Sequence, residues 1–438
     1  MKSARQVEIA GYGVISPIGN DLADFDNSLF DHHSALEIEN IRLTGQDPFS
    51  VVLARCALQT QNYLTPSKLF ADRATALALT SVEKALQHSG MDISKIDCER
   101  LGVFWGSGMA GASSFDETTR TIYNENKRIR PTSVISSMPS TPASEIALKL
   151  KAQGACITYA NACASSGIAI GEGMKAILSG DIDVAIVGGS ESMLTPGLLA
   201  AWNALRVMVP VKNQHMGCMT PFSIGRSGFA MGEGAAALVI MRPDASQHLG
   251  LSSKTNLFLS GYANNSDGHH ITNPNPVSQA RVMKLALKNA GLEPRDIGYI
   301  NAHGTGTQLG DASEANAIFN VFGETMPWVG STKGLHGHLL GASGAVEMIA
   351  CIRALTLNKI PANSVNADID PDLLLKVINE KNITIPNFSH AMSNSFAFGG
   401  TNACLIISKD HDLYTRTKGP RTKNVRWRWG QTHTSSYP

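Results

Sequence analysis

Residues 161–189 have the sequence NACASSGIAIGEGMKAILSGDIDVAIVGG, and the prediction of the fold starts from this stretch. Ser165 to Leu178 has the spacing of small and apolar residues that is typical of a helix. Asp183 to Gly189 is a short apolar run that ends in glycine, which predicts a buried strand. The stretch therefore predicts a helix that leads into a strand of a covered sheet.

The same alternation continues on both sides of this stretch. Glycine-bounded apolar runs predict strands, and longer amphipathic runs that end in glycine predict helices. The predicted strands are Val7 to Gly11, Leu101 to Gly106, Leu257 to Gly261 and Ile297 to Asn301, and the predicted helices are Ala74 to Gly90 and Ser278 to Gly291. Strands that alternate with helices indicate an α/β protein whose sheets are mostly parallel and covered on both faces.

Two similar segments indicate an internal duplication. ALQHSGM begins at Ala85 and ALKNAGL begins at Ala286, and each precedes a short linker with an acidic residue and an apolar strand. Any amphipathic helix that ends in glycine would give a similar match, so this alternative stays open. The shared order of helix, linker and strand favours a duplicated α/β unit, divided near Arg242 to Ser253.

The composition is that of a globular chain. Of its 438 residues 43% are apolar and 17% charged, which suffices for a sizeable core and argues against disorder. The 37 Lys and Arg nearly balance the 36 Asp and Glu, which gives a formal net charge of +1. Because no basic excess spans the chain, the composition gives no support to nucleic-acid binding.

This charge is unevenly distributed along the chain. Residues 413–438 carry six basic residues and no acidic one, which leaves 31 basic against 36 acidic residues in the remainder. The apolar periodicity is lost after about Asp412. We therefore expect a mildly acidic body with an appended basic tail.

The N-terminus and the cysteines bear on the compartment. No basic segment followed by a long apolar stretch is present at the N-terminus, and no apolar run approaches the roughly 20 residues of a membrane span. The scattered cysteines lack CxxC spacing, which argues against a disulfide framework and a zinc site. We expect reduced thiols in a cytoplasmic protein that does not bind membranes; the cysteines are Cys56, Cys98, Cys156, Cys163, Cys218, Cys351 and Cys404.

Cys163, in the segment NACASSG (161–167), is the strongest candidate for a nucleophile. It is flanked by small residues and precedes the predicted helix, whose N-terminal dipole and free N–H groups favour a thiolate. Small neighbours also leave room for a thioester and leave N–H groups for a developing oxyanion. From this segment alone, an ordinary buried cysteine remains equally compatible.

Two histidine segments follow in the second half. His303 lies in NAHGTGT (301–307) directly after a predicted strand, where α/β proteins place active groups. His338 lies in STKGLHGH (331–338) and precedes a small-residue helix start. His336 and His338 form an HxH pair, but no carboxylate or cysteine lies nearby in the sequence, so we do not expect a metal site.

The fourth segment is SNSFAFGGTN (393–402). Its phenylalanines, Phe396 and Phe398, and its glycines, which include Gly399, can bring backbone N–H groups close to a substrate. A tight turn between two strands explains the segment equally well.

In this order and spacing the four segments resemble the elongating β-ketoacyl-acyl-carrier-protein synthases, which are condensing enzymes of the thiolase fold. The similarity extends from Val7 (VEIAGYGVISPIG) to Ile407 and includes GSGMAG at 106–111 and TPFSIGRSGFAMGEGAA at 220–236. The resemblance implies a layered α-β-α-β-α structure of two duplicated α/β halves. Residues 1–250 would form the half with Cys163, residues 251–412 the half with both histidines, and residues 413–438 the tail.

The resemblance also implies a mechanism. Cys163 would take an acyl group from a carrier-protein phosphopantetheine, and a malonyl carrier would then lose CO₂ and attack this acyl group. His303 and His338 would each present an N–H to the malonyl thioester oxygen. The N–H groups of Cys163 and Phe398 would form the oxyanion hole, and Phe398 would gate access. No bound cofactor is implied.

Further residues match the family pattern at single positions. Lys333 matches its active-site lysine and Glu347 the acidic partner of that lysine, either to tune the site or as a structural ion pair. Asn301, Glu347, Ser393 and Asn394 match a structural monovalent-cation site of some relatives. Thr305 and Thr307 match hydroxyls that bind pantetheine, and Met109 matches the end of the acyl pocket near a dimer interface, with core packing as the alternative.

The implied partners are an acidic carrier protein and a second subunit. Carrier docking would use exposed basic side chains, for which the candidates are Lys127, Arg128, Arg130, Arg206 and, less well matched, Lys68. The tail with Trp427 and Trp429 is a further hypothesis for carrier binding. The dimer would be either a homodimer or a heterodimer with a chain-length-factor-like homologue.

Two departures from the family pattern bear on the pathway. Ser227 stands where the family has Asp, and the segment from Leu194 to Arg206 resembles specialised polyketide, polyene or nodulation-type synthases more than housekeeping fatty-acid enzymes.

A thiolase would need a second catalytic cysteine at the turn that carries Phe398, and an initiating synthase would use Cys-His-Asn. A catalytically silent scaffold or length-determining subunit is the remaining alternative, which the Cys-His-His set argues against.

Overall fold

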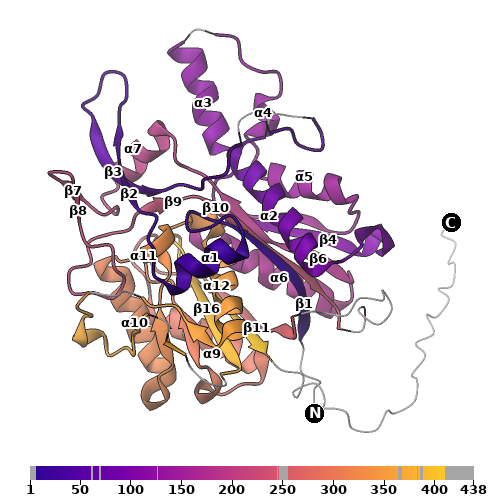
Figure 1. Cartoon of the computed structure of the whole chain (residues 1–438), viewed down its shortest axis with the longest axis vertical. Coiled ribbons are helices and arrows are strands. Elements are labelled where there is room, and N and C mark those ends of the chain that lie inside the picture. Colours follow the sequence, from indigo (N-terminus) through magenta and orange to yellow (C-terminus); the bar gives the residue numbers. More distant parts are fainter. Residues whose placement is uncertain are drawn as a thin grey trace, which may run out of the picture.

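The structure is a computed structural model, and it describes residues 6–409 except 61–62, 69–70, 126, 244, 246–254, 364–366, 382 and 385–387. Its largest sheet is mixed and has ten strands, and the strands lie across the middle of Figure 1. The strand order is β13-β12-β16-β17-β11-β1-β10-β6-β4-β5. The expected boundary at residue 250 and the tail 413–438 lie outside the described residues.

The sheet consists of two halves with the same topology. In the first half β1 (Val7–Ile15) is followed outward by β10 (Gly234–Met241), β6 (Val184–Glu191), β4 (Leu101–Gly106) and β5 (Cys156–Tyr159). In the second half β11 (Leu257–Ser266) is followed by β17 (Thr401–Lys409), β16 (His390–Phe396), β12 (Tyr299–Asn301) and β13 (Trp328–Gly330). Each half pairs its first three strands antiparallel and its last three parallel, and β1 and β11 join the halves. The predicted duplication is therefore present.

The segments ALQHSGM and ALKNAGL occupy equivalent places in the two halves. Each segment forms the end of a helix, α2 (Arg73–Ser89) or α9 (Pro276–Ala290). Its glycine, Gly90 or Gly291, is the left-handed residue directly after that helix. The two helices cover β1 and β11, whose pairing shifts register at equivalent glycines, Gly11 and Gly261. A Cβ at either glycine would lie 2.5 or 2.6 Å from a carbonyl oxygen of the covering helix, so only glycine allows this approach.

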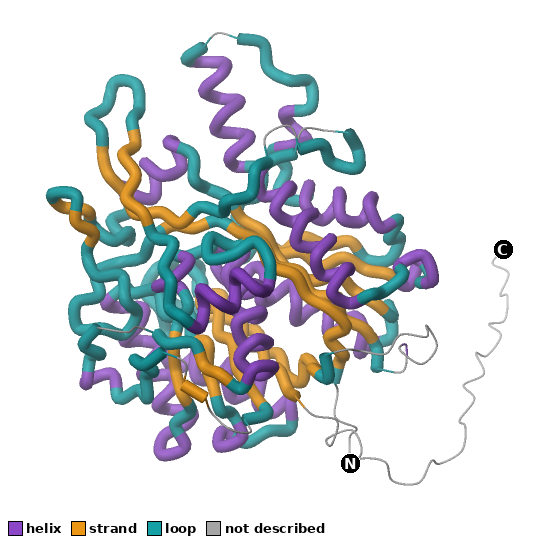
Figure 2. Tube along the Cα trace, viewed as in Figure 1, coloured by secondary structure: helices purple, strands orange, loops and turns teal. Residues whose placement is uncertain are grey.

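The contacts between elements give the predicted five layers, and Figure 2 marks the helices and strands that form them. Two buried helices, α6 (Ser165–Ser179) and α12 (Ser343–Leu357), form the central layer and contact each other. Each packs on the parallel strands of its own half and on strands of the other half. The outer layers contain α2 and α5 (Thr141–Leu150) on one side and α9 and α10 (Gln308–Phe322) on the other.

The prediction of mostly parallel sheets was wrong. Five of the nine strand pairings in the large sheet are antiparallel. Helical crossovers mark only the parallel pairs in a sequence, whereas β16 and β17 form a hairpin and β10 returns after a long loop region. The pattern of helices therefore revealed the parallel part of each half and not the antiparallel part.

Shorter elements surround this core. The helices are α1 (Leu22–Phe30), α3 (Ala112–Tyr123), α4 (Ser133–Ser136), α7 (Pro196–Ala204) and α11 (Lys333–His336), and the strands are β2 (Glu37–Ile41), β3 (Phe49–Ala54), β7 (Val211–Lys212), β8 (His215–Met216), β9 (Met231–Gly232), β14 (Lys359–Ile360) and β15 (Ile383–Thr384). In Figure 1 α3 and α4 project from the top of the first half.

One helical stretch, Leu340–Leu357, is long and apolar enough to cross a membrane by composition alone. However, 83% of it is buried inside the protein. Most of its apolar residues belong to the hydrophobic cluster that also contains residues of α6 and of the central strands. The stretch is therefore the core helix between the two halves.

Candidate active site

Cys163 lies in a tight turn at the start of the central helix α6. The 3-10 turn η3 (Ala162–Ala164) follows β5, and Ala162 adopts a left-handed conformation with φ of +45°. The hydroxyl of Ser165 closes the turn, since it accepts from Asn161 N–H (2.9 Å) and donates to Ala162 O (2.6 Å). The buried thiol is thereby held at the N-terminus of the helix, as the sequence predicts.

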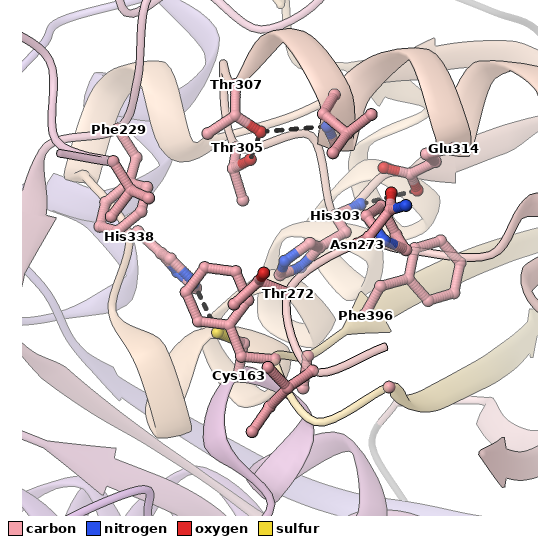
Figure 3. Close-up of a pocket in the computed structure, with 18 of the residues that line it drawn as sticks. Cys163, Phe229, Thr272, Asn273, His303, Thr305, Thr307, Glu314, His338 and Phe396 are labelled. Carbon is pink, nitrogen blue, oxygen red and sulfur yellow. Dashed lines mark hydrogen bonds between the residues drawn. The ribbon is translucent and has the colours of Figure 1, made fainter. Parts of the chain in front are cut away.

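Both candidate histidines approach this thiol from the second half (Figure 3). His338 precedes the 3-10 turn η6 (Leu340–Ala342), and its Nε2 lies 3.0 Å from Cys163 Sγ. His303 follows β12, and its ring centroid lies 5.4 Å from that of His338, nearly edge to face. Ligand atoms of Cys163, His303 and His338 all lie within 4.8 Å of one another. The packing of α6 against α12 thus brings residues 175 positions apart into one cluster.

The second ring nitrogen differs between the two histidines. His338 Nδ1 lies 2.9 Å from Ser343 Oγ and 3.3 Å from Leu340 N, whose N–H points at it. His303 Nδ1 is buried and has no hydrogen-bond partner among the described residues. A partner for the second ring nitrogen is therefore present at His338 and absent at His303 among the described residues. The backbone of His303 is fixed instead, because its N–H donates to Glu314 Oε1 (2.9 Å).

Burial dominates the protonation of Cys163. It raises the pKa of the thiol to about 12, because the charged thiolate loses its hydration in the closed site. The charge of Lys333 and the backbone N–H groups of Phe398 and Cys163 itself lower that pKa, because each favours the thiolate. The oxyanion hole implied for these two N–H groups stays a prediction. The effect expected for the thiolate exists, but desolvation outweighs it.

Both histidines are neutral in this environment. Burial is the largest cause that lowers the pKa of His303 and of His338, and the positive charge of Lys333 is the second. A neutral imidazole carries one N–H and can donate it to a substrate oxygen. Phe229 closes the other side of His338, with ring centroids 5.3 Å apart.

Lys333 forms a fully buried ion pair with Glu347. The lysine starts α11 and the glutamate lies in α12, and neither side chain is exposed. The other carboxylate oxygen, Glu347 Oε2, has no partner among the described residues. The lysine therefore has two roles in the geometry: it pairs with Glu347, and its charge acts on the thiol and on both histidines.

Unpartnered polar atoms occur at the residues matched to a cation site. The oxygens Asn301 Oδ1, Asn394 Oδ1 and Glu347 Oε2 are buried without a partner in the part of the chain that the structure describes. Asn301 and Ser393 lie side by side in the parallel pair β12–β16, and Asn394 follows directly. Oxygen atoms are ligands that hard cations prefer, so this set fits such an ion.

The thiol and histidines line a cavity of about 310 Å³. Three of the candidate substrate-binding residues line this cavity, namely Thr305, Thr307 and Phe396. The gate candidate Phe398 lines it as well. Thr305 Oγ1 and Thr307 Oγ1 lie 3.0 Å apart. Apolar side chains also line the cavity, and they include Trp202, Leu205, Val207, Phe229 and Leu340.

Two of the predicted substrate-binding residues do not line this cavity. Met109 is 47% exposed at the surface of the single chain, which excludes its alternative of core packing. Its backbone N–H donates to Glu191. Gly399 lies in the turn between β16 and β17, and its N–H donates to Ile271 O (2.7 Å) rather than toward the cavity.

The loop between β11 and α9 lines the cavity mouth and was missed in the sequence. It supplies Asp267, His270, Thr272 and Asn273, among others. Asp267 N–H donates to Gly400 O (2.7 Å), and Asn402 Nδ2 donates to Asp267 Oδ1 (2.7 Å), so this loop holds the turn that carries Phe398. The segment NSDGHHITNPNP (265–276) has a polar, turn-forming composition that suits any surface loop, so only its histidines gave a signal.

The candidate docking residues fall into separate places. Arg206 is exposed beside Leu205 and Val207, at the cavity. Lys127, Arg128 and Arg130 are exposed around a different hollow next to α3 and α4, and Lys68 is exposed elsewhere. Ser227, the departure from the family pattern, donates its hydroxyl to Cys218 O (3.0 Å) and does not line the catalytic cavity.

The histidines give no support for a metal centre. His336 is turned away from His338, because its ring nitrogens bond Thr332 Oγ1 and Gly337 O. Cys163, His303 and His338 are close enough to share an ion. A histidine that binds a metal normally donates its other ring N–H to an acceptor, whereas Leu340 N–H points at His338 Nδ1 as a donor.

Comparisons with known proteins agree on one family. The model "Beta-ketoacyl synthase, N-terminal domain" matches residues 4–245, and "Beta-ketoacyl synthase, C-terminal domain" matches residues 258–366. The chain is 33% identical over 423 residues to 3-oxoacyl-[acyl-carrier-protein] synthase 2 of Staphylococcus aureus (strain COL), covering 93% of this chain and 99% of the relative. It is 32% identical over 415 residues to nodulation protein E of Rhizobium meliloti (strain 1021), covering 92% and 99%.

A solved structure shares the fold over nearly the whole chain. It is a ketosynthase in complex with its chain length factor from Xenorhabdus doucetiae. The TM-score is 0.79 at 27% identity, and the match covers 93% of this chain and 98% of that chain.

Proposed function

The chain belongs to the β-ketoacyl synthase family, and on this premise we propose that Cys163, His303 and His338 condense a malonyl group with an enzyme-bound acyl group. The enzyme is an acyltransferase that forms a C–C bond between substrates carried on the phosphopantetheine of acyl carrier protein. The observation that carries the assignment of residues is the contact of Cys163 Sγ with His338 Nε2 at 3.0 Å, with His303 beside them at the end of a cavity.

The first half-reaction loads the thiol. Cys163 Sγ attacks the carbonyl carbon of an acyl thioester, the carrier thiol leaves with a proton, and the acyl group remains on sulfur. The N–H groups of Phe398 and Cys163, which already lower the thiol pKa, receive the oxyanion that forms at the carbonyl. The thiol loses its proton only as the substrate is attacked, because burial keeps it protonated before that.

The second half-reaction forms the new bond. The malonyl carrier loses CO₂, and the electron pair of the broken bond forms an enolate, whose oxygen accepts N–H groups from His303 and His338. The enolate carbon attacks the acyl carbonyl and displaces Cys163 Sγ as a thiolate, which takes up one proton from water. The product is a 3-ketoacyl carrier two carbons longer. Neutral histidines suit this role; burial first, and the charge of Lys333 second, lower their pKa values and keep them neutral.

We assign a structural monovalent cation to Asn301, Glu347, Ser393 and Asn394. The buried, unpartnered oxygens of three of these residues support the assignment. Such an ion would bind these oxygens and hold β12, which His303 follows, against β16. It would take no part in the bond-forming steps.

The partners are an acyl carrier protein and a second ketosynthase-like subunit. Arg206, beside the cavity, is the docking residue that the geometry supports best, while Lys127, Arg128, Arg130 and Lys68 remain candidates on other surfaces. The edge strand β5 and the exposed apolar residues Phe115, Val134 and Met138, beside α3 and α4, offer a surface to a second subunit. Met109 is exposed in the same region of sequence, so we retain it as an acyl-pocket residue that a second subunit would cover.

For the pathway we propose specialised acyl assembly in the cytoplasm rather than housekeeping fatty-acid synthesis. Ser227 and the segment 194–206 depart from the elongating enzymes, and one relative is nodulation protein E. All seven cysteines are free thiols in the structure, as suits a reducing compartment. A product assay with saturated, unsaturated and aromatic acyl carriers tests this. Exclusive use of saturated fatty-acyl carriers would contradict it.

The reaction itself is tested by intact mass. Incubation with an acyl carrier should add one acyl group to the wild-type chain and none to Cys163→Ala, and malonyl carrier should then discharge the group as a 3-ketoacyl product. Absence of an adduct with every acyl donor, with and without a homologous subunit, would favour the silent scaffold. Deletion of residues 413–438 tests the tail, and unchanged carrier affinity would remove it from carrier binding.

A further inference from the structure

A buried serine beside His338 has no role in the two half-reactions described above. Ser343 is the first residue of α12 and is fully buried, and its hydroxyl lies 2.9 Å from His338 Nδ1. We propose that Ser343 is a positioning residue, whose hydroxyl holds the hydrogen of His338 on Nε2 and so aims an N–H at the reacting groups. The proposal rests on the proposed function for its kinetic consequences only.

The backbone contact with His338 shows which ring nitrogen carries the hydrogen. Leu340 N–H points at His338 Nδ1 with an N···N distance of 3.3 Å. An N–H cannot donate to a nitrogen that itself carries hydrogen, so Nδ1 must present its lone pair. The hydroxyl of Ser343 must then be the donor in its contact with Nδ1. The hydrogen of the neutral ring is left on Nε2, which faces Cys163 Sγ at 3.0 Å.

Ser343 is the stronger of the two donors on Nδ1 by distance. Its contact at 2.9 Å has ordinary hydrogen-bond length, whereas the contact of Leu340 N at 3.3 Å lies beyond the usual range. In the described part of the chain the Ser343 hydroxyl has no other hydrogen-bond partner, so its hydrogen is available to the ring. Without Ser343, the long backbone contact alone would have to fix the tautomer.

The first half has a serine at the position equivalent to Ser343, but its hydroxyl makes different contacts. Ser165 starts α6 as Ser343 starts α12, and each follows a 3-10 turn whose first residue is left-handed, Ala162 or Leu340. Ser165 spends both hydrogen-bonding functions on its own turn. Ser343, at the equivalent place, turns its hydroxyl to a catalytic side chain instead. The same structural position thus builds the nucleophile turn in one half and supports the histidine in the other.

The same contact opposes protonation of His338. Two donors on the Nδ1 lone pair stabilise the neutral ring, which adds to the effects of burial and of nearby positive charge. The titratable and charged groups that face the ring come from four elements: Cys163 in η3, His303 after β12, Lys333 and His336 in α11, and Glu347 in α12. Of these, Lys333 and His336 act against a charged ring. Ser343 differs from them, because its hydroxyl bonds the ring directly and adds to the Leu340 N–H in keeping Nδ1 free of hydrogen.

The test compares Ser343→Ala with Ser343→Thr, which keeps a hydroxyl, and with Ser260→Ala. Ser260 is a buried serine in β11 that bonds Ser408 Oγ (2.6 Å) and does not touch the site. Loss of one hydrogen bond to a catalytic group is expected to lower kcat of condensation in Ser343→Ala by about ten-fold, with KM for the malonyl carrier unchanged. Ser343→Thr should recover much of this loss, and Ser260→Ala should behave as wild type.

The pH profile distinguishes positioning from a merely structural role. Removal of a donor to the lone pair makes the ring easier to protonate, so the pKa of His338 rises in Ser343→Ala. The acid limb of the kcat profile should therefore move to higher pH in Ser343→Ala alone. A wild-type kcat and profile in that variant would overturn the proposal.

A spectroscopic measurement on the unloaded protein is independent of the reaction. With ¹⁵N-labelled histidine, a ring nitrogen that carries hydrogen resonates apart from one that does not, and His338→Asn identifies the signals. We expect the hydrogen on Nε2 in the wild type and a mixture of tautomers in Ser343→Ala. A wild-type signal from Nδ1–H, or an unchanged spectrum in Ser343→Ala, would overturn the proposal even if no acyl substrate is ever found.

Discussion

Lys333 is a buried cation on which the charge balance of the site depends. Its only carboxylate partner in the described part of the chain is Glu347, and both side chains are withdrawn from water. Lys333→Met would leave the carboxylate without its partner, which is expected to cost about 3–5 kcal/mol of unfolding free energy. Removal of both charges in Lys333→Met/Glu347→Leu should recover most of that loss. Urea unfolding of the two variants beside the wild type measures the difference.

The double variant also separates stability from chemistry. With the charge of Lys333 gone, the pKa of each histidine should rise, so the acid limb of the condensation profile should move to higher pH even where the protein is stable. If the single variant were as stable as the wild type, the pair would have no structural role. A double variant with an unmoved pH profile would contradict the electrostatic role.

His303 and Cys163 should separate the two half-reactions. Because His303 is assigned to the enolate and not to acyl transfer, His303→Ala is expected to slow decarboxylation and condensation by about 10²–10³-fold. Loading of Cys163 should persist at a substantial rate, as seen by intact mass. The exposed His215 offers a matched control in His215→Ala, with both steps at wild-type rates. Condensation at a normal rate by His303→Ala would refute the assigned role.

At this scale the sequence located the reactive groups better than it described their chemistry. Cys163, His303 and His338 were identified from their small-residue surroundings and from the family resemblance, and the structure brings them together. The rise in the pKa of Cys163 could not be predicted, because desolvation depends on what covers the thiol. Ser343 was missed for a similar reason, since only the fold of η6 turns its hydroxyl to the ring.

At the scale of elements, the turn between β16 and β17 offers a matched pair of glycines. Both are left-handed, with φ of +87° at Gly399 and +73° at Gly400. A Cβ at Gly399 would meet nothing within 4 Å, whereas at Gly400 it would lie 2.8 Å from Asp267 Cβ. Gly399→Ala should therefore show backbone strain alone, about 1–2 kcal/mol. Gly400→Ala should also push the turn that carries Phe398 away from the loop at Asp267.

Condensation kinetics and urea unfolding of both variants check this prediction. We expect a larger loss of kcat in Gly400→Ala than in Gly399→Ala, because only the former displaces the turn from its partner loop. Equal losses would mean that strain within the turn, and not its contact with Asp267, controls the position of Phe398.

The repeated elements of the two halves could be predicted from the sequence, whereas contacts between elements distant in the sequence could not. The helix–glycine–linker–strand order at Ala85 and Ala286 correctly indicated the duplication, because the same backbone demand recurs at Gly11 and Gly261. Antiparallel neighbours such as β10 and β6 left no comparable mark, since the chain between them follows no crossover rule. The loop 267–273 was missed because its contact with the Phe398 turn exists only between distant segments.

At the scale of the whole molecule, buried ionisable groups make the free energy of unfolding depend on pH. Burial raises the pKa of Glu191 and Glu314 to about 7 and that of Asp311 to about 6, although backbone N–H groups hold each carboxylate. The buried histidines have lowered pKa values, and between about pH 4.5 and 6.5 their contribution has the opposite sign. In the wild type the contributions of the carboxylates and the histidines partly cancel in the pH dependence of the unfolding free energy. Only the difference between a variant and the wild type isolates the contribution of one residue.

Glu191 is the buried carboxylate whose substitution tests this pH dependence best, because its side chain joins three segments. It accepts N–H groups from Gly108 (2.6 Å), Met109 (3.2 Å) and Gly341 (3.3 Å), and so ties the end of β4 to the turn after His338. Between pH 4.5 and about 7 the native state retains the proton of Glu191 while the unfolded chain has lost it. The contribution of Glu191 to the free energy of unfolding therefore falls as pH rises through this window.

Glu191→Gln removes this titration and should be less stable overall, because an amide cannot accept as many N–H groups. The difference in unfolding free energy, variant minus wild type, should nevertheless increase between pH 5 and about 7 and stay constant above that, by at most on the order of 3 kcal/mol. Urea unfolding at fixed protein concentration from pH 5 to 8 measures it, with Glu37→Gln as a control that removes an exposed carboxylate. A difference independent of pH would show that Glu191 is ionised throughout, held by its N–H donors against the cost of burial.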